Sequence, residues 1–411
     1  MSNVLIISSD CHAGALPATY KEYMPSKYHE AADGWWLRYA REMVLRTGTF
    51  FDQEAIEDYK EKTGDAGRMQ SMMEAPAAID DDALRLMLSD ENSVFAPRKG
   101  EWDESVRLKD LEADGIAAEV IFPQMATFGA GLLQYRTPVD PEHNLAGIRS
   151  YNRWLADLCK ASPGRRAGVA LINVDDIEVT VSEVRDAQKM GLFGGVLLPT
   201  HTGEHPFYHH KRYEPLWAVC EDIGMPIHAH SGWSPDYGDG PAATAMYISE
   251  VDMWAHRPFA ALVWSGAFER HPNLKFILTE TGCSWILETL RVLEFKADLP
   301  IFGHFTTHLT LRPSEYFQRQ CYLGASFLYP HEGEDRHRIG LDKLMWGSDY
   351  PHLEGSWPNT MDSLRATFGN YPESEIRTML GGTLMEVLGF DPELLVPIGD
   401  RIGPALSEIT G

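Results

Sequence analysis

Short apolar segments recur along the chain and alternate with stretches whose apolar residues follow a helical period. Eight of the short segments predict strands: Val4–Ser9, Ala117–Phe122, Gly168–Ile172, Gly194–Leu198, Pro226–His230, Lys275–Glu280, Cys321–Ser326 and Leu344–Asp349. Helices are predicted for Asn144–Ala161, Ile177–Met190, Tyr213–Ile223 and Phe259–Arg270. This alternation predicts an α/β fold, a (β/α)8 TIM barrel, with an open doubly wound sheet as the alternative. The chain has no GxGxxG or Walker A sequence to support a nucleotide site in such an open sheet.

One interval breaks this rhythm. Residues 13–116, between the first and second predicted strands, are rich in Met, Trp, Tyr and acidic side chains. A connection of this length is usually functional or carries structure of its own. Because it follows the carboxyl end of a strand, we expect a largely helical insertion that caps the active site of a single domain, residues 1–411. A helical decoration on the side of the barrel is the alternative. Candidate pocket residues in the insertion are Trp35, Trp36, Met43, Met69, Met72 and Met73.

The charge balance restricts the possible partners. With 36 basic and 60 acidic residues, the chain has a formal net charge of −24, which opposes binding to nucleic acids and anionic membrane surfaces. No apolar run approaches the ~18–20 residues of a membrane helix. The N-terminal sequence MSNVLIISSDCHAG lacks the basic region of a signal peptide. We therefore expect a cytoplasmic protein that binds neither nucleic acid nor membrane.

Cysteine and tryptophan usage adds two expectations. The five cysteines show no CxxC spacing, so neither a disulfide framework nor a thiolate zinc site is indicated. The eleven tryptophans and the apolar segment Leu394–Ile402 provide more apolar surface than the predicted strands alone. We expect a homodimer, although a monomeric barrel with a cap could bury the same side chains.

Potential metal ligands gather at the ends of four predicted strands. They are Asp10, His12, His228, His230, Glu280, Asp349 and His352. A single histidine is more often a satisfied core residue, and an aspartate at a strand end more often caps a helix. The coincidence at four strands favours a metal site, because the carboxyl ends of barrel strands meet at one mouth. A set of nitrogen and oxygen donors without thiolate suits Zn, Mn or Fe. A further histidine patch, at residues 201–210, is interpreted as pocket lining, a solvated loop or a second metal site.

Four motifs resemble the amidohydrolase superfamily, specifically its branch that includes aminocarboxymuconate-semialdehyde decarboxylase-like enzymes. They are the DxH of residues 10–12, PIHAH at 226–230, HPNLKFIL at 271–278 and WGSDYP at 346–351. The resemblance implies a distorted TIM barrel with a catalytic divalent metal. It also implies that four residues bind the metal, namely Asp10, His12, His230 and Asp349.

The chain departs from the decarboxylase-like pattern at two positions. Glu280 stands where that pattern has a histidine, and His352 stands where an apolar or aromatic residue is usual. The metal ligands are therefore expected to be Asp10, His12, His230, Glu280, Asp349 and His352, and the catalytic residues Asp349, Glu280 and His228. In its carboxylate-rich site the chain resembles TIM-barrel dinuclear non-heme iron monooxygenases that act on CoA-linked acids.

Three functions follow as hypotheses. The first is a monooxygenase that uses two iron ions to hydroxylate a sizeable apolar acid or its CoA thioester. The alternative is a zinc- or manganese-dependent hydrolase or non-oxidative decarboxylase, acting through metal-activated water or a metal-polarised carboxylate. The third is a non-catalytic binding protein on a barrel scaffold. The fourth predicted strand ends without a lysine, at residues 197–200, so it cannot supply the carbamate bridge of many dinuclear hydrolases. We favour the oxygenase.

Overall fold

Eight parallel strands form the centre of the molecule. The computed structural model describes residues 3–50, 80–89, 98–129, 139–238, 240–352 and 354–411. The strands are β1 (Ile6–Ala13), β2 (Ile116–Pro123), β3 (Arg166–Leu171), β4 (Gly195–Leu197), β5 (Ile227–His230), β6 (Phe276–Thr279), β7 (Cys321–Ser326) and β8 (Leu344–Gly347). They pair in chain order from β1 to β8. A parallel bridge between Cys11 and Tyr350 joins β1 to the segment after β8. The predicted TIM barrel is confirmed.

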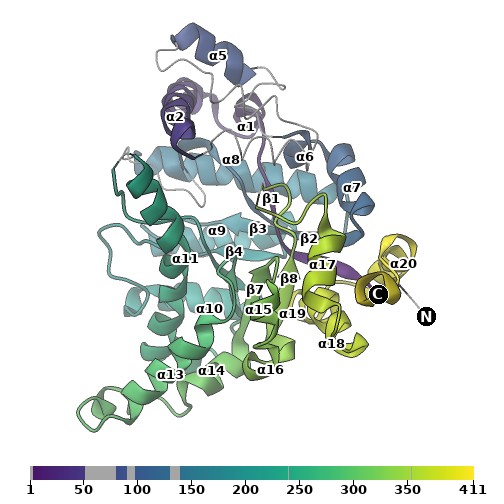
Figure 1. Ribbon diagram of the computed structural model, residues 1–411. Coiled ribbons are helices and arrows are strands. Elements are labelled where there is room, and N and C mark those ends of the chain that lie inside the picture. Colours follow the sequence, from purple (N-terminus) through teal and green to yellow (C-terminus); the bar gives the residue numbers. More distant parts are fainter. Residues whose placement is uncertain (1–2, 51–79, 90–97, 130–138, 239, 353) are drawn as a thin grey trace.

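Helices surround this barrel (Figure 1). Those in the β1–β2 interval are α1 (Pro17–Glu22), η1 (Ser26–Tyr28), α2 (His29–Phe50), α5 (Asp81–Ser89), α6 (Lys99–Trp102) and α7 (Glu104–Ala113). Those from β2 to β6 are η2 (Thr127–Gly129), α8 (Pro141–Lys160), α9 (Ile177–Met190), η3 (Lys211–Tyr213), α10 (Glu214–Asp222), α11 (Pro241–Trp264) and α12 (Ala267–Arg270). Those from β6 to β8 are α13 (Trp285–Asp298), η4 (Gly303–Phe305), α14 (Pro313–Gln320), α15 (Pro330–Gly333), α16 (Arg336–Ile339) and η5 (Leu341–Lys343). The last are α17 (Thr360–Phe368), α18 (Glu373–Arg377), η6 (Thr378–Gly382), α19 (Thr383–Leu388), α20 (Pro392–Ile402) and α21 (Leu406–Thr410).

Local signals explain where these elements begin and end. The helix predicted for Ile177–Met190 has these bounds in the structure, because Asp176 caps its first backbone N–H groups and Gly191 ends it in a left-handed conformation. The helix predicted for Phe259–Arg270 is instead divided between α11 and α12. Gly266 adopts a φ of 71° between them, which no helix continues through. No helix in the described part of the chain has both the length and the apolar character to cross a bilayer.

The first strand is longer than predicted. It extends past the predicted segment Val4–Ser9 to Ala13, and every residue in it is buried. The pairing with β2 extends to Ala13 opposite Pro123, after a register shift between Ser8 and Cys11. Asp10 and His12 therefore lie inside a fully buried strand.

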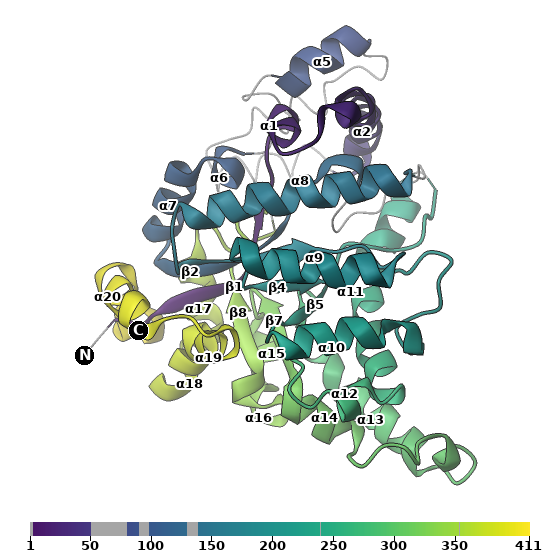
Figure 2. The same cartoon turned by 180° about the vertical axis from the view of Figure 1, so that it is seen from behind.

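The β1–β2 interval is helical where the structure describes it. Helices α1, α2 and α5 stand together beyond α8 in both views (Figures 1 and 2). Trp35 and Trp36 are buried within this group. Met69, Met72 and Met73 lie outside the described residues, and the side chain of Met43 is not described. The interval returns to the barrel through α6 and α7, which pack against β1 and β2 respectively.

Candidate metal centre

β1 carries the first two of the candidate ligands. Asp10 and His12 are fully buried, and alternation along the strand directs both side chains to the same side. Oδ1 of Asp10 lies 3.4 Å from Nε2 of His12 and 3.3 Å from Nε2 of His230, at the end of β5. Oδ2 of Asp10 accepts a hydrogen bond of 2.5 Å from Ser326 at the end of β7. Three strand ends thus hold the Asp10 carboxylate in one orientation.

Glu280 and Asp349 also contact this cluster, and both have a strained backbone conformation. Their φ angles are 52° and 55°, in the left-handed region that residues with side chains seldom adopt. Oε2 of Glu280 lies 3.5 Å from Nε2 of His12 and 3.3 Å from Nε2 of His230. Oδ1 of Asp349 lies 3.2 Å from Nε2 of His12. Such strained residues cluster at functional sites, so the local geometry itself marks the β6 and β8 ends.

His352 completes the cluster from the segment after β8. Its Nδ1 lies 2.9 Å from Oδ1 of Asp349. Two sets of ligand atoms result, each lying within 4.8 Å of one another: Asp10, His12, His230 and Glu280 in one set, and His12, Glu280, Asp349 and His352 in the other. The structure therefore brings together all six residues expected to bind metal.

The hydrogen bonds of the three imidazoles suit metal binding. Nδ1 of His230 contacts the carbonyl oxygen of Ser231 at 2.9 Å, and Nδ1 of His12 contacts that of Pro123 at 3.4 Å. Nε2 of His352 lies 2.5 Å from Oε1 of Gln124. With the proton on the nitrogen that faces Ser231, Pro123 or Gln124, the other nitrogen of each ring could present its lone pair to a cation in the cluster. Ligating histidines normally have such an outer partner.

Several atoms in the centre have no hydrogen-bond partner. Within the described part of the chain, these buried atoms include Nε2 of His12, Oε2 of Glu280, both Oδ atoms of Asp349 and Nδ1 of His352. Burying polar or charged atoms without a partner is costly. Lone pairs of three carboxylates and three imidazoles converge here, and a divalent cation would satisfy them together. The residues present therefore fit a metal ion.

In this cluster, the charges of neighbouring side chains outweigh the effect of burial on each pKa. Burial acts to raise the pKa of Asp10, but His230 and His12 outweigh it and hold this pKa below its usual range. Burial acts to lower the pKa of His12, but the nearby carboxylates of Asp10, Asp349 and Glu280 raise it well above its usual value. For His352, burial is likewise outweighed by the Asp349 charge, and its pKa rises to about 9. Positive charge beside these buried carboxylates therefore stabilises them, and it can come from protonated histidines or from a bound cation.

His228 does not join this cluster. Its Nε2 donates to the carbonyl oxygen of Gly194 at 2.8 Å, and burial lowers its pKa to about 4. Gly195 has no side chain, which leaves room for the His228 ring. The histidine patch at residues 201–210 also stays apart: the His201 ring stacks on Trp233 with centroids 4.4 Å apart. Among the described residues, clusters of three or more side chains that could hold a metal ion occur only in the six-residue centre.

The sequence reasoning missed the residues that orient the ligands. Gln124 contacts His352, Ser231 donates to Oε1 of Glu280 at 2.9 Å, and Ser326 donates to Asp10. Ser231 and Ser326 lie directly after or at the end of a strand, and Gln124 follows β2. Their position at strand ends was the available signal, but small polar residues are common there.

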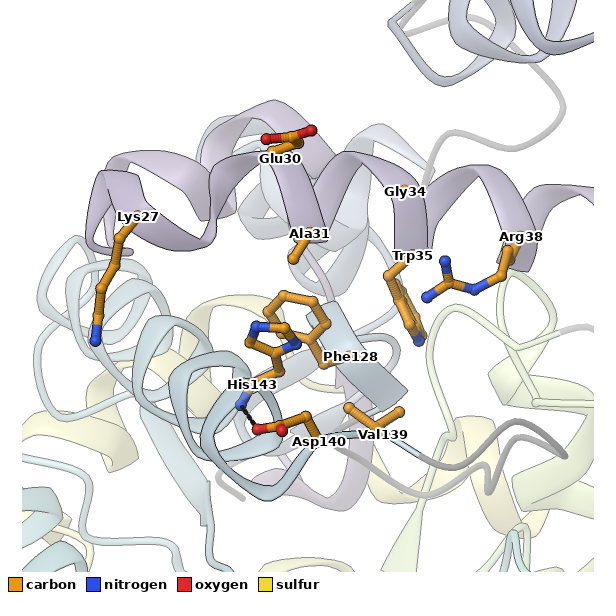
Figure 3. A pocket seen from close by; sticks show the side chains of 10 residues that line it. All are labelled: Lys27, Glu30, Ala31, Gly34, Trp35, Arg38, Phe128, Val139, Asp140 and His143. Atoms are coloured by element: carbon orange, nitrogen blue, oxygen red, sulfur yellow. Dashed lines mark hydrogen bonds between the residues drawn. The ribbon is translucent and has the colours of Figure 1, made fainter.

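A cavity of about 560 Å³ lies between α2, η2 and the start of α8 (Figure 3). Trp35 and Arg38 project into it from α2, facing Phe128 and His143, whose rings stack with centroids 5.0 Å apart. The described residues that line it include none of the six of the metal centre. The cavity is therefore separate from the candidate metal centre.

The fold and the donor cluster define a TIM-barrel enzyme with a site for a divalent cation. A family model described as amidohydrolase matches residues 97–390, and the chain belongs to this family. It is 22% identical over 308 residues to the 2-amino-3-carboxymuconate-6-semialdehyde decarboxylase of Dictyostelium discoideum, covering 71% of this chain and 78% of that protein.

Solved structures share the fold at low sequence identity. An amidohydrolase of Mycobacterium avium subsp. paratuberculosis superposes with a TM-score of 0.65 at 18% identity, covering 95% of this chain and all of that one. A dihydroxybenzoic acid decarboxylase of Polaromonas, solved with manganese and the inhibitor 2-nitroresorcinol, gives a TM-score of 0.58 at 16% identity, covering 96% and 99% of the two chains.

The expectation of an oxygenase is wrong. The curated proteins that this chain resembles include the Dictyostelium decarboxylase above and gamma-resorcylate decarboxylases, which agrees with the alternative hypothesis. Glu280 and His352 suggested iron, but a set of carboxylate and imidazole donors serves several hard or borderline divalent cations equally. The two iron ions and the CoA thioester were parts of the oxygenase hypothesis, and neither is part of the decarboxylase alternative.

Proposed function

We propose that this protein is a metal-dependent non-oxidative decarboxylase of a small aromatic or similarly unsaturated carboxylic acid. The observation that carries the proposal is the cluster of buried, unpartnered ligand atoms on His12, Glu280, Asp349 and His352 at the mouth of the barrel. The decarboxylases among its relatives supply the reaction class.

Asp10, His12, His230 and Asp349 would hold the cation, with Glu280 and His352 as further ligands. Manganese or zinc fits this set, because both accept imidazole and carboxylate donors; manganese is the ion bound in the Polaromonas decarboxylase. When bound, the cation would polarise an oxygen of the substrate and stabilise negative charge next to the reacting carbon. The six side chains would hold the cation at the mouth of the barrel.

We assign to Asp349 the role of proton donor to the carbon that loses CO2. Decarboxylation breaks the bond between the carboxyl carbon and its neighbour, and the electron pair stays on the neighbouring carbon. That carbon takes up a proton as CO2 leaves. Neither oxygen of Asp349 has a hydrogen-bond partner among the described residues. Because Oδ1 faces His12, Oδ2 can carry this proton. Glu280 is held more firmly, since its Oε1 accepts from Ser231. His228 lies outside the cluster and is given no step.

We also propose that α2 covers part of the mouth. Helix α2 contacts η2, which follows β2, and α11, which follows β5. Nε1 of Trp36 donates to Oγ1 of Thr127 at 3.2 Å. Replacing Trp36 by Phe keeps most of the packing but removes this bond. If α2 is part of a cap, the W36F variant should raise KM more than it lowers kcat.

The homodimer remains a proposal. Large apolar side chains are exposed after and along α13: Phe295 is 56% exposed, Ile301 69% and Phe305 65%. Exposed apolar surface of this kind often marks a protein interface. Light scattering at micromolar concentration tests it, and a monomer of about 46.2 kDa would contradict it.

The activity is tested with the full chain loaded with Mn(II) or Zn(II) and incubated with a panel of hydroxylated benzoates. Substrate-dependent CO2 release, abolished by a chelator, would support the proposal. Asp349→Asn should lower the rate by at least about 100-fold, whereas Asp362→Asn, on the exposed face of α17, should not change it. Hydrolysis of amides or esters without any CO2 release would instead identify a hydrolase.

A further inference from the structure

Arg107 is a fully buried arginine beside the metal centre that has no part in the proposed chemistry. It lies on α7, the helix through which the β1–β2 interval returns to the barrel. Its Nη1 donates to the carbonyl oxygen of His12 at 2.8 Å and to that of Gly100 at 3.0 Å. Its Nε and Nη2 pair with Glu119 on β2 at 2.8 and 2.5 Å. The guanidinium thus joins the backbone of one candidate ligand to an adjacent strand.

The same guanidinium also contacts the segment after β8. It lies 5.2 Å from the ring centroid of Tyr350, the residue next to Asp349. The Tyr350 carbonyl oxygen accepts from the His12 backbone N–H at 2.6 Å, and the Tyr350 hydroxyl donates to Asp110 on α7 at 2.8 Å. His12 is therefore held at both backbone groups, by Arg107 on one side and by Tyr350 on the other.

The side chain of Tyr350 packs directly against Gly100 on α6. A Cβ atom at Gly100 would lie 1.7 Å from the Tyr350 hydroxyl oxygen, so only glycine leaves room for the ring. The Gly100 carbonyl oxygen is also one of the acceptors of Arg107. Helix α6 thus packs against β1, which carries His12, and residues of both α6 and α7 contact Tyr350, the neighbour of Asp349.

We propose that Arg107 is a positioning residue of the metal centre, which sets the separation of His12 and Asp349 by fixing the backbones that carry them. The inference rests on the proposed metal site. The planar guanidinium offers several donors in a fixed geometry, which a lysine ammonium does not reproduce. It acts on the ligands only through their main chain and through Tyr350, and it touches no reacting atom.

Arg166 provides a matched control. It is also buried, at 2% exposed, and its Nε lies 3.3 Å from the same Glu119. Its other bonds go to the carbonyl oxygens of Leu158 and Glu104, at 2.9 and 3.4 Å, and none that the structure describes goes to His12 or Tyr350. Replacing either arginine by lysine weakens the ion pair with Glu119, but only Arg107→Lys releases His12.

The experiment measures Mn(II) affinity of the full chain by the paramagnetic resonance signal of free Mn(II), and the melting temperature after chelation. Arg107→Lys should weaken Mn(II) binding by about tenfold or more, and it should alter the spectrum of bound Mn(II). Arg166→Lys should lower the melting temperature of the chelated protein without changing Mn(II) affinity. Equal Mn(II) affinities in the wild type and the R107K variant would overturn the inference, as would equal losses in the R107K and R166K variants.

If the R107K variant does not fold, the Tyr350→Leu variant tests the same inference through its Mn(II) affinity. It removes the ring beneath Arg107 but keeps the main-chain bond to His12, so Mn(II) binding should weaken about threefold to tenfold. Unchanged binding in this variant would contradict the inference. These measurements need no turnover: if the wild type binds Mn(II) but releases no CO2, the proposed reaction fails while the role of Arg107 is still decided. A wild type that binds no divalent cation overturns both.

Discussion

His352 stacks on His12, with ring centroids 3.9 Å apart and planes 24° apart, although one residue follows β8 and the other lies on β1. Stacking fixes the plane of the His352 ring, and the contact with Gln124 fixes which edge faces the cluster. Nδ1 of His352 is consequently aimed at Asp349. The orientation of this ligand depends on Gln124, a residue outside the donor set.

Gln124→Leu should therefore weaken metal binding. The leucine cannot accept the Nε2 proton of His352, so the ring loses its preferred tautomer and its anchor. We expect the affinity for Mn(II) or Zn(II) to fall by about tenfold, as for other outer partners of metal-bound histidines. Gln188→Leu on α9 is the control, because Gln188 makes only a 3.5 Å contact at the surface. Unchanged affinity in the Q124L variant would show that the stacking alone orients His352.

Removing the metal should destabilise the fold. Without a cation, three carboxylates converge in a buried centre that lacks sufficient hydrogen-bond partners. A ligand that binds only the folded state at about 100 times its Kd adds about 2.7 kcal/mol of stability. Thermal unfolding with a chelator should thus give a melting temperature a few degrees lower than with Mn(II) or Zn(II). A melting temperature that does not respond to either ion would argue that the centre holds protons instead.

The barrel was predictable because its strands are buried on both faces and read as continuous apolar runs. The first strand shows where this signal ends. The predicted strand stops at Ser9, because the polar Asp10 and His12 follow. In the structure both residues lie within β1, whose pairing with β2 continues to Ala13. The polar side chains are buried because they belong to the site, and a pattern based on hydrophobicity cannot anticipate that.

The six candidate ligands could be named from the sequence because barrel topology brings strand ends together. Their supporting residues could not. In sequence Arg107 cannot be told from a surface charge on a helix, and its burial depends on how α7 packs against β2 and how its side chain reaches the backbone of β1. His228 illustrates a second limit. It shares a face with His230 by alternation, but it lies two residues deeper in β5 and bonds to Gly194, the residue before β4. Depth along the barrel depends on strand register, which the sequence does not display.

Glu280→Gln tests the residue that departs most from the decarboxylase-like pattern. Glutamine keeps an oxygen for the Ser231 hydrogen bond but removes one negative charge from the cluster. We expect metal affinity to fall by about 10- to 100-fold. If Glu280 acts only as a ligand, a large excess of metal should restore CO2 release. Glu288→Gln, which changes an exposed residue of α13 paired with Arg291, is the matched control. A rate that stays low at saturating metal would give Glu280 a direct part in the proton transfer.

A pH-dependent prediction concerns Asp114, a buried carboxyl at the end of α7 that accepts a hydrogen bond from Thr360. Burial raises its pKa in the folded protein to about 6, above the value of about 3.9 expected in the unfolded chain. Between these two values the folded state holds the proton while the unfolded state has lost it. Stability therefore falls as the pH rises from about 4 to about 6, by roughly 1–3 kcal/mol for this group.

Asp114→Asn removes this dependence, because the amide stays neutral and can still accept from Thr360. At pH 7.5 the D114N variant should be more stable than the wild type by about 1–2 kcal/mol in urea unfolding, and at pH 4 the advantage should disappear. Both proteins are measured with a chelator present, so the carboxylates of the metal centre contribute equally and cancel in the difference. Asp362→Asn, an exposed residue of α17, controls for the loss of one surface charge. A stability difference that is the same at both pH values would mean that the Asp114 carboxyl ionises in the folded state as easily as in the unfolded chain.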